Sequence, residues 1–228
     1  MSNHQGRHLG VGGFDNQKGY FTQTPSHWDH WPLYENAKSV YMYQEPEGAQ
    51  EQPLLDRAVR YASRKYEGLY RTSTKLVPVS LPYIVHPMDV MLRVAYLGIS
   101  DPDMLGAALF HDLLEDTDTC PNDLGTEFSP TVQRLVEALT YDKSEGSKQE
   151  YLDNLCVSEI RVLILKLADR ASNVESFKYG NPAYAGTYAH KADAIYKAVL
   201  DRREEIQLIF GGHVCADATN LANELLNF

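Results

Sequence analysis

The chain has 228 residues, of which 43% are hydrophobic, and carries a formal net charge of −10 at pH 7. This length suits one domain with an appendage or two small domains, and the apolar fraction is sufficient for a core that needs no disulfides. The negative charge argues against an extended electrostatic contact with nucleic acid or with an anionic membrane, but it allows a small anionic ligand beside a metal ion.

The first 52 residues differ in composition from the rest of the chain. Residues 1–19 are rich in Gly, His and Gln and are predicted to form a flexible arm. Between Thr24 and Tyr43, large aromatic rings are frequent, which favours packing against the domain, a second copy of the chain or a larger assembly. Plain disorder is the alternative. The rings belong to Trp28, Trp31, Tyr34, Tyr41 and Tyr43.

Residues 53–228 are predicted to form an all-α domain behind a largely irregular N-terminal extension of residues 1–52. From residue 53 onward, apolar residues recur at helical spacing, and we find no convincing alternating strand pattern. The expected helices begin near Leu54, Pro87, Pro102, Pro130, Ile160 and Pro182, with a short one from Asp217.

Three of these helices have recognisable ends. Asp101 and Ser129 each precede a proline, the pattern of an N-cap followed by proline in the first helical turn. The helix that starts after Asn181 is expected to be long and to run to about Phe210, where Gly211 and the next glycine stop it.

Cysteine content and hydropathy limit the cellular setting. The three cysteines have spacings that fit neither a disulfide framework nor a zinc knuckle. No stretch reaches the roughly 18 consecutive apolar residues of a membrane span. The N-terminus lacks the basic-then-apolar layout of a signal peptide. We therefore expect a cytoplasmic protein that binds neither membranes nor nucleic acid. The cysteines are Cys120, Cys156 and Cys215.

The segment from His111 to Thr117 places one imidazole and three carboxylates within six residues, directly after an apolar run. On a continuous helix, His111 and Glu115 share a face, as do Asp112 and Asp116. His111 and Asp112 then lie about 100° apart, close enough to reach one ion. A bound cation offsets the cost of burying such groups. A solvated acidic helix end is the alternative.

Two further segments favour a buried site. His86 precedes Pro87, and because proline disfavours helical geometry in the residue before it, His86 is expected at a fixed helix entrance. Asp169 begins a polar stripe inside a strongly apolar helix, which favours a buried site over a wet helix face. By itself, such a histidine is usually structural. The stripe consists of Asp169, Ser172, Asn173 and Ser176.

Three segments together resemble a known family. PYIVHP (82–87), HDLLEDTDT (111–119) and KLADRASN (166–173) occur in the order typical of the HD phosphohydrolase superfamily. The sequences of these segments are similar to those in the hydrolase domain of the RelA/SpoT alarmone enzymes, especially the small stand-alone metazoan type. The resemblance extends over about residues 54–205.

The resemblance implies a single divalent cation and a pair of catalytic carboxylates. Two imidazoles and two carboxylates suit manganese, with zinc or iron as alternatives. Glu115 and Asp116 match the pair that orients and deprotonates the attacking water. The implied metal ligands are His86, His111, Asp112 and Asp169.

The resemblance also implies substrate contacts. Arg71 matches an arginine that packs against the base, and Asn173 matches a position that contacts the nucleotide. Lys75 is expected to supply a further positive charge, and Ser176 extends the polar stripe toward the substrate. Glu175 stands where many relatives have an arginine.

These features predict a small-molecule nucleotide substrate. The resemblance implies attack of water on the 3′-pyrophosphate of ppGpp or pppGpp, the alarmones of the stringent response, with release of pyrophosphate and GDP or GTP. One alternative is an HD hydrolase of another phosphorylated nucleotide, such as a deoxynucleotide or the phosphate of NADPH. The other is a non-enzymatic HD-like scaffold whose aromatic extension docks onto an assembly.

Overall fold

The computed structural model describes residues 14–15, 20–21, 53–71, 81–142, 144 and 146–228. The chain divides into two units, Met1–Glu51 and Gln52–Phe228. Lys75 and the aromatic segment of residues 24–43 lie outside the described residues.

In the first unit, β1 (Phe14–Asp15) pairs antiparallel with β2 (Tyr20–Phe21). β1 lies within residues 1–19, the arm predicted to be flexible. The composition of this arm does not indicate a strand. Aromatic residues favour strands, which is the local reason for this pairing.

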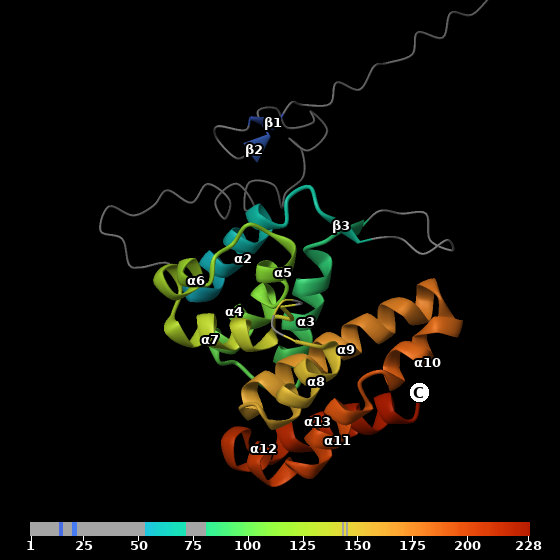
Figure 1. Ribbon diagram of the computed structural model, residues 1–228. Coiled ribbons are helices and arrows are strands. Elements are labelled where there is room, and N and C mark those ends of the chain that lie inside the picture. Colours follow the sequence, from blue (N-terminus) through green and yellow to red (C-terminus); the bar gives the residue numbers. More distant parts are fainter. Residues whose placement is uncertain (1–13, 16–19, 22–52, 72–80, 143, 145) are drawn as a thin grey trace, which may run out of the picture. The chain divides into compact units, whose positions relative to one another are not determined.

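The second unit is helical, which confirms the all-α class (Figure 1). Besides the helices, its described residues include the antiparallel pair β3 (Tyr70–Arg71) and β4 (Leu81–Pro82). The helices are α2 (Leu54–Lys65), α3 (Val85–Tyr96), α4 (Pro102–Phe110), α5 (Leu113–Asp116), α6 (Pro121–Glu127), α7 (Pro130–Leu139), α8 (Lys148–Val157), α9 (Ile160–Gly180), α10 (Pro182–His190), α11 (Asp193–Asp201), α12 (Arg203–Phe210) and α13 (Gly212–Leu226).

The predicted caps of α4 and α7 are confirmed. The Asp101 side chain accepts hydrogen bonds from the N–H groups of Asp103 and Met104, and Ser129 accepts one from Val132. These contacts satisfy amide groups that have no partner inside the first helical turn.

The start of α3 differs from the prediction. The helix begins at Val85, so His86 lies within its first turn rather than before it. Pro87 is tolerated at the third position because the first four N–H groups of a helix have no intrahelical partner. His86 is therefore fixed by helical geometry.

The single long helix expected after Asn181 is wrong. The chain forms α10, α11 and α12, with breaks at Lys191–Ala192 and at Arg202. Arg202 stabilises the second break by donating hydrogen bonds to the carbonyls of Cys156 and Ser158, at 3.2 and 2.7 Å. Because these contacts come from α8 and the turn after it, the local helical pattern could not reveal the break.

Gly211 does end α12, and its φ of 89° is a left-handed conformation that glycine adopts without strain. The last helix, α13, begins at Gly212 and has 15 residues, so it starts earlier and is longer than expected.

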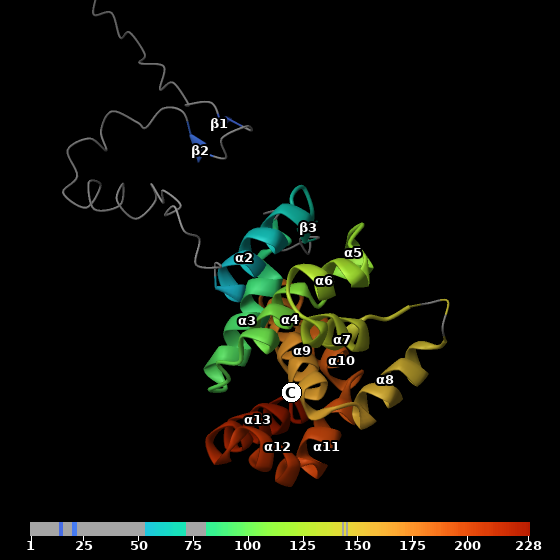
Figure 2. The same ribbon diagram turned by 90° about the vertical axis from the view of Figure 1, so that its left-hand side faces the viewer.

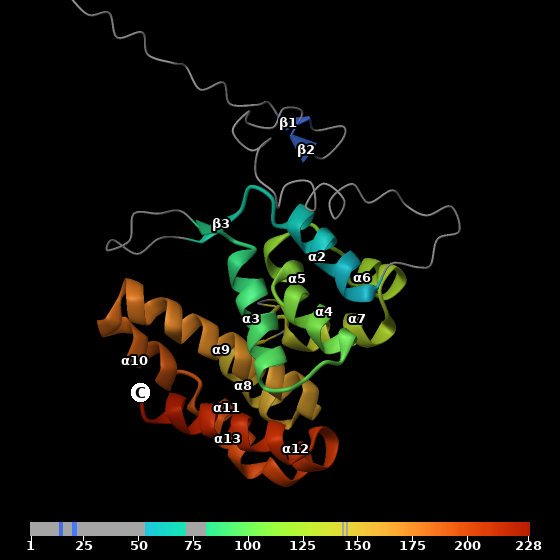
Figure 3. The same cartoon turned by 180° about the vertical axis from the view of Figure 1, so that it is seen from behind.

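α9 is the central helix of the second unit. It packs against α3, α4 and α7 and against α10, α11 and α13, and it lies between α3 and the C-terminal helices in two opposite views (Figures 1 and 3). Figure 2 shows α11, α12 and α13 gathered at one end of this unit. A helix that is apolar on nearly all sides is typically buried in this way.

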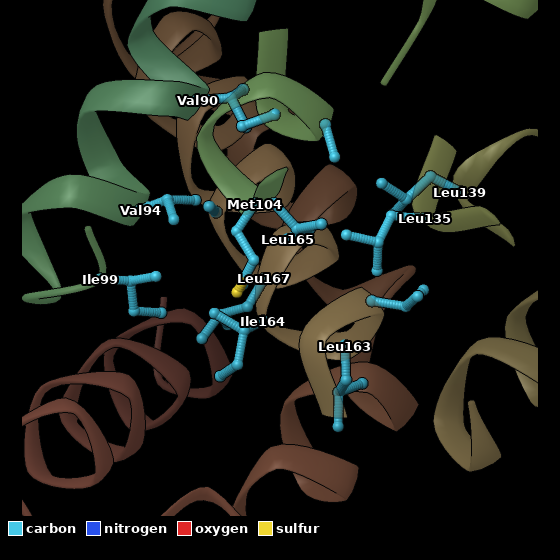
Figure 4. Close-up of a cluster of buried hydrophobic side chains, with 14 of the residues drawn as sticks. Val90, Val94, Ile99, Met104, Leu135, Leu139, Leu163, Ile164, Leu165 and Leu167 are labelled. Atoms are coloured by element: carbon cyan, nitrogen blue, oxygen red, sulfur yellow. The ribbon is translucent and has the colours of Figure 1, made fainter. Parts of the chain in front are cut away.

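The core forms where α9 meets its neighbours (Figure 4). Val90 and Val94 come from α3, and Met104 comes from α4. Each is fully buried, as are the residues of α9 around them. Further core residues in the close-up are Ile99, Leu135, Leu139, Leu163, Ile164, Leu165 and Leu167. Polar residues at the centre of α9 are therefore held by a rigid support. Among the described residues, no helix is long and apolar enough to cross a membrane.

Candidate active site

His111 and Asp112 lie at a break between two helices, not on one continuous helix as predicted. α4 ends at Phe110, and α5 begins at Leu113. The His111 ring contacts the carbonyl of Ala108 through Nδ1 at 2.8 Å. In a continuing helix that carbonyl would pair with the N–H of Asp112. The expectation that His111 shares a helix face with Glu115, and Asp112 with Asp116, therefore does not hold. His111 and Asp112 nevertheless lie together, with Nε2 3.0 Å from Oδ2.

The structure brings the four expected metal ligands together. His86 comes from the first turn of α3, Asp169 from the middle of α9, and the other two from the α4–α5 junction. The two Nε2 atoms of the histidines lie 3.2 Å apart. His111 Nε2 lies 3.0 Å from Asp112 Oδ2 and 3.7 Å from Asp169 Oδ1. His86 Nε2 lies 3.3 Å from Asp169 Oδ1 and 3.7 Å from Asp112 Oδ2.

These donors fit a divalent cation. A backbone carbonyl can only accept, so His111 Nδ1 donates to Ala108, and Nε2 of the neutral ring presents a lone pair to the centre. Burial disfavours a charged ring, yet the nearby Asp112 and Asp169 carboxylates raise the pKa of His111 to about 9. A positive charge at this centre is thus strongly favoured. A divalent cation would supply that charge, and the two imidazoles are ligands of the type such a cation takes.

Asp169 is held by two neighbours on α9. Lys166 Nζ lies 2.9 Å from Oδ2, and the Asn173 amide donates to Oδ1 at 2.6 Å. Although burial raises the pKa of Asp169, Lys166 and the histidines hold it well below its usual value. Lys166 was not predicted as a site residue. Its position three residues before Asp169 in an apolar run was the available signal.

Tyr83 is a second residue that the sequence did not single out. Its hydroxyl donates to Asp112 Oδ2 at 2.6 Å, and its ring meets that of His86 edge-on at 6.2 Å. Tyr83 precedes His86 by three residues in the PYIVHP segment, which was the only local hint of this role.

A cavity of about 170 Å³ opens beside the metal ligands. It is mixed in charge, because lysine and arginine side chains line it together with the carboxylates. The lining residues are Tyr83, His86, Asp112, Glu115, Tyr141, Lys148, Tyr151, Leu152, Lys166, Asp169, Arg170, Asn173 and Tyr188.

The two residues of the expected catalytic pair occupy different positions. Glu115 lines the cavity, and its Oε1 accepts a hydrogen bond from the N–H of Tyr141 at 2.8 Å. Burial raises the pKa of Glu115. Both side chains are exposed in part, but Asp116, unlike Glu115, is not among the lining residues and lies beside Tyr83.

Of the expected substrate-binding residues, the structure describes Arg71, Asn173 and Ser176, and Arg71 contacts the other two. The Arg71 guanidinium donates to Asn173 Oδ1 at 2.5 Å and to Ser176 Oγ at 3.3 Å. Glu175 does not line the cavity, and its carboxylate lies 3.8 Å from Lys178 Nζ. The loss of a family arginine at this position therefore puts no negative charge into the cavity.

Fold and site together define an α-helical protein with a candidate divalent-metal centre. A family model described as the HD domain matches residues 58–206. The chain belongs to the HD-domain family. This membership implies dependence on a divalent metal, in agreement with the donor set described above.

Several known proteins are similar to the chain. It is 32% identical over 134 residues to the guanosine-3′,5′-bis(diphosphate) 3′-pyrophosphohydrolase MESH1 of Danio rerio, covering 57% of this chain and 72% of that protein. It is 34% identical over 137 residues to a guanosine-3′,5′-bis(diphosphate) 3′-pyrophosphohydrolase of Aquifex aeolicus, covering 58% of this chain. The chain spans only 18% of the length of this long relative.

A solved structure has a similar fold. It is described as a metazoan ortholog of SpoT that hydrolyzes ppGpp and plays a role in starvation responses. The TM-score is 0.62 at 25% sequence identity, and the match covers 78% of this chain and 97% of that one.

Proposed function

We propose that the protein is a metal-dependent phosphohydrolase that removes the 3′-pyrophosphate of ppGpp or pppGpp. The observation that carries this proposal is that His86, His111 and Asp112 offer ligand atoms within 4.8 Å of one another, with Asp169 Oδ1 3.3 Å and 3.7 Å from the Nε2 atoms of His86 and His111, beside a cavity that Glu115 also lines. The names of the similar proteins support the choice of substrate.

The four converging residues would hold the cation. Two imidazoles and two carboxylates form a borderline-hard set, for which we propose manganese, with zinc or iron as alternatives. When bound, such a cation lowers the pKa of water and polarises a phosphoryl oxygen.

The residues of the chain supply proton transfer and charge balance. Glu115 accepts the proton of the attacking water, and its hydrogen bond from the Tyr141 N–H fixes the carboxylate for this role. Asp116 assists by orienting the water. Water adds its hydroxyl to phosphorus, the bond from phosphorus to the ribose 3′ oxygen breaks, and that oxygen takes a proton. Lys148, Lys166 and Arg170 are cations in the cavity lining that would offset the phosphate charge.

The nucleoside would lie toward Arg71, Asn173 and Ser176. The guanidinium is planar and stacks on aromatic faces, so Arg71 suits contact with a base. Asn173 offers amide and carbonyl groups to the sugar or base. Lys75 remains a proposed further cation.

A side-by-side assay tests the substrate. With saturating manganese, we expect release of pyrophosphate from ppGpp and little hydrolysis of GTP, dATP or NADPH. Preferential cleavage of dATP or of the NADPH phosphate would leave the hydrolase chemistry intact and contradict the alarmone assignment. No hydrolysis of any of them by metal-loaded protein would favour a non-enzymatic scaffold.

Substitution of Arg71 or Asn173 by alanine is expected to raise KM for ppGpp more than it lowers kcat. A hydrogen bond to a charged group contributes about 1.5–3 kcal/mol, so KM should rise about 10-fold or more for Arg71→Ala. Steady-state kinetics on both variants check this. Glu175→Gln is the matched control, because Glu175 lies on the same helix as Asn173 but outside the cavity. If Arg71→Ala lowers kcat by a larger factor than it raises KM, a purely binding role for Arg71 is contradicted.

A further inference from the structure

The solvent side of α3 is wholly apolar. The other side of this helix packs against α4 and α9, and in Figure 2 the helix lies at one edge of the helical unit. By contrast α2, which also has 12 residues, exposes only polar side chains. We refer to the exposed residues of α3 as the α3 face, which consists of Val85, Met88, Leu92, Ala95 and Tyr96.

The α3 face leaves large apolar side chains in water. Tyr96 is 79% exposed, and Leu92 at the middle of the face is 43% exposed. Each square ångström of apolar surface left in water costs about 25 cal/mol relative to burial. A contiguous exposed patch of this kind marks an interaction site on a soluble protein, whereas single exposed apolar residues do not.

The spacing of these residues fits a second helix. Val85, Met88, Leu92 and Ala95 follow one another at intervals of three, four and three residues. This is the spacing of the apolar seam along which two helices pack with interdigitating side chains. A partner for the α3 face is therefore expected to offer a helix with a similar seam.

The α3 face is complementary to itself in size. Two copies of α3 that run antiparallel about a two-fold axis near residues 90 and 91 bring opposite ends of the face together. The small Val85 then lies opposite the partner's Tyr96, and Met88 lies close to the partner's Leu92. A two-fold axis always joins the same patch of both subunits, so such self-complementarity is what a symmetric dimer requires.

The charges at the border of the face are complementary in the same arrangement. Asp89 and Arg93 border one side of the face, and within one helix Arg93 Nε donates to Asp89 Oδ2 at 2.8 Å. In an antiparallel pair related by a two-fold axis, the same border of each helix faces that of the other. Asp89 then comes close to the partner's Arg93, and the opposite charges attract each other.

We propose that the α3 face is a homodimer interface, in which the α3 helices of two copies of the chain pack antiparallel about a two-fold axis. The α3 face contains none of the candidate metal ligands and none of the residues that line the cavity. Dimer formation can therefore be tested independently of the proposed activity.

The test is sedimentation velocity of the full chain over a range of concentrations up to about 100 µM. A single pair of helices gives a small interface, so we expect a reversible dimer with a Kd of about 1–50 µM. Leu92→Glu brings two carboxylates together near the axis and should weaken the dimer at least about 10-fold. Leu208→Glu is the matched control, because Leu208 is 85% exposed on α12, and it should leave the dimer intact.

A charge exchange tests the antiparallel arrangement. Asp89→Lys places a second cation near the partner's Arg93 and should weaken the dimer, whereas the double variant Asp89→Lys, Arg93→Asp restores opposite charges and should recover it. Circular dichroism checks that each variant is folded. If Leu92→Glu does not fold, Tyr96→Glu at the most exposed position of the face takes its place.

Three results would overturn the proposal. One is a wild-type chain that stays monomeric at about 100 µM, whether the face is then covered by residues 1–52 or by a different protein. The second is a dimer that folded Leu92→Glu does not weaken, because the interface then lies elsewhere. The third is a dimer that Asp89→Lys does not weaken, or that the charge exchange does not recover, because the helices then do not meet antiparallel in this register.

Discussion

Replacement of Asp169 by asparagine is expected to abolish binding of divalent metal and to lower the rate of ppGpp hydrolysis by at least about 10²–10³-fold, the loss typical of removing a charge-stabilising group. The Asp169 carboxylate lies within 3.3 Å of His86 Nε2 and 3.7 Å of His111 Nε2. The amide keeps the size of the side chain and removes its charge. Elemental analysis and Mn²⁺ titration of the purified variant provide the measurement.

The alanine variant at this position should also lower stability. Asp169→Ala leaves Lys166, which lies 2.9 Å from the lost carboxylate, as a buried charge without its main counterion. Breaking a buried pair in this way typically costs about 3–5 kcal/mol of folding free energy. Asparagine removes the same counterion but keeps a side-chain oxygen that can accept a hydrogen bond from Lys166. Thermal unfolding should therefore give a lower Tm for both variants than for the wild-type protein, and the lower of the two for alanine.

A double variant separates stability from metal binding. Combining Asp169→Asn with Lys166→Met removes both members of the pair, so stability should return toward that of the wild-type protein while metal binding stays absent. Asp153→Asn, a change on an exposed helix face, is the control for the amide substitution itself. Full metal occupancy in folded Asp169→Asn would show that this residue is not a ligand.

The candidate metal ligands could be named from the sequence because they lie in short segments that resemble the HD family. His86, His111 and Asp169 each stand in an apolar context where a lone polar group has a cost. What could not be predicted was how they meet. The His111 ring donates a hydrogen bond to the Ala108 carbonyl, which in a continuing helix would accept from the Asp112 N–H, and the helix ends there. Hydrophobic periodicity does not reveal this competition between a side chain and the backbone.

The supporting residues were harder to predict, since their roles depend on contacts distant in sequence. Arg71 meets Asn173 across 102 residues, although each was separately expected to bind the nucleotide. Ser172 was visible only as part of a polar stripe, and its partner His86, whose Nδ1 lies 2.9 Å from the Ser172 hydroxyl, comes from another helix. The break after α11 escaped prediction for the same reason, because Arg202 donates hydrogen bonds there to α8 and to the turn after it.

Glu115→Gln and Asp116→Asn are expected to leave metal occupancy nearly intact and to reduce kcat by about 10²–10⁴-fold, the range typical of general acid–base assistance. The carboxylates that lie within 4 Å of the His86 and His111 rings are those of Asp112 and Asp169, whereas Glu115 and Asp116 form no such pair with either ring. Glu115 lines the cavity and has its pKa raised by burial, which makes it the better proton acceptor of the two. The larger loss is therefore expected for Glu115→Gln.

Metal content and turnover, measured on the same preparations, distinguish a catalytic group from a ligand. Glu127→Gln offers a matched control, because Glu127 lies at the end of α6 and does not line the cavity. If Glu115→Gln or Asp116→Asn loses its metal, that residue belongs to the coordination sphere and its proton-transfer role is wrong. If both keep metal and full activity, the proton of the attacking water must leave by another group. Of the remaining carboxylates that line the cavity, Asp112 and Asp169 are already engaged with the histidines. An unchanged rate would thus contradict the proposed chemistry rather than shift it to a neighbouring carboxylate.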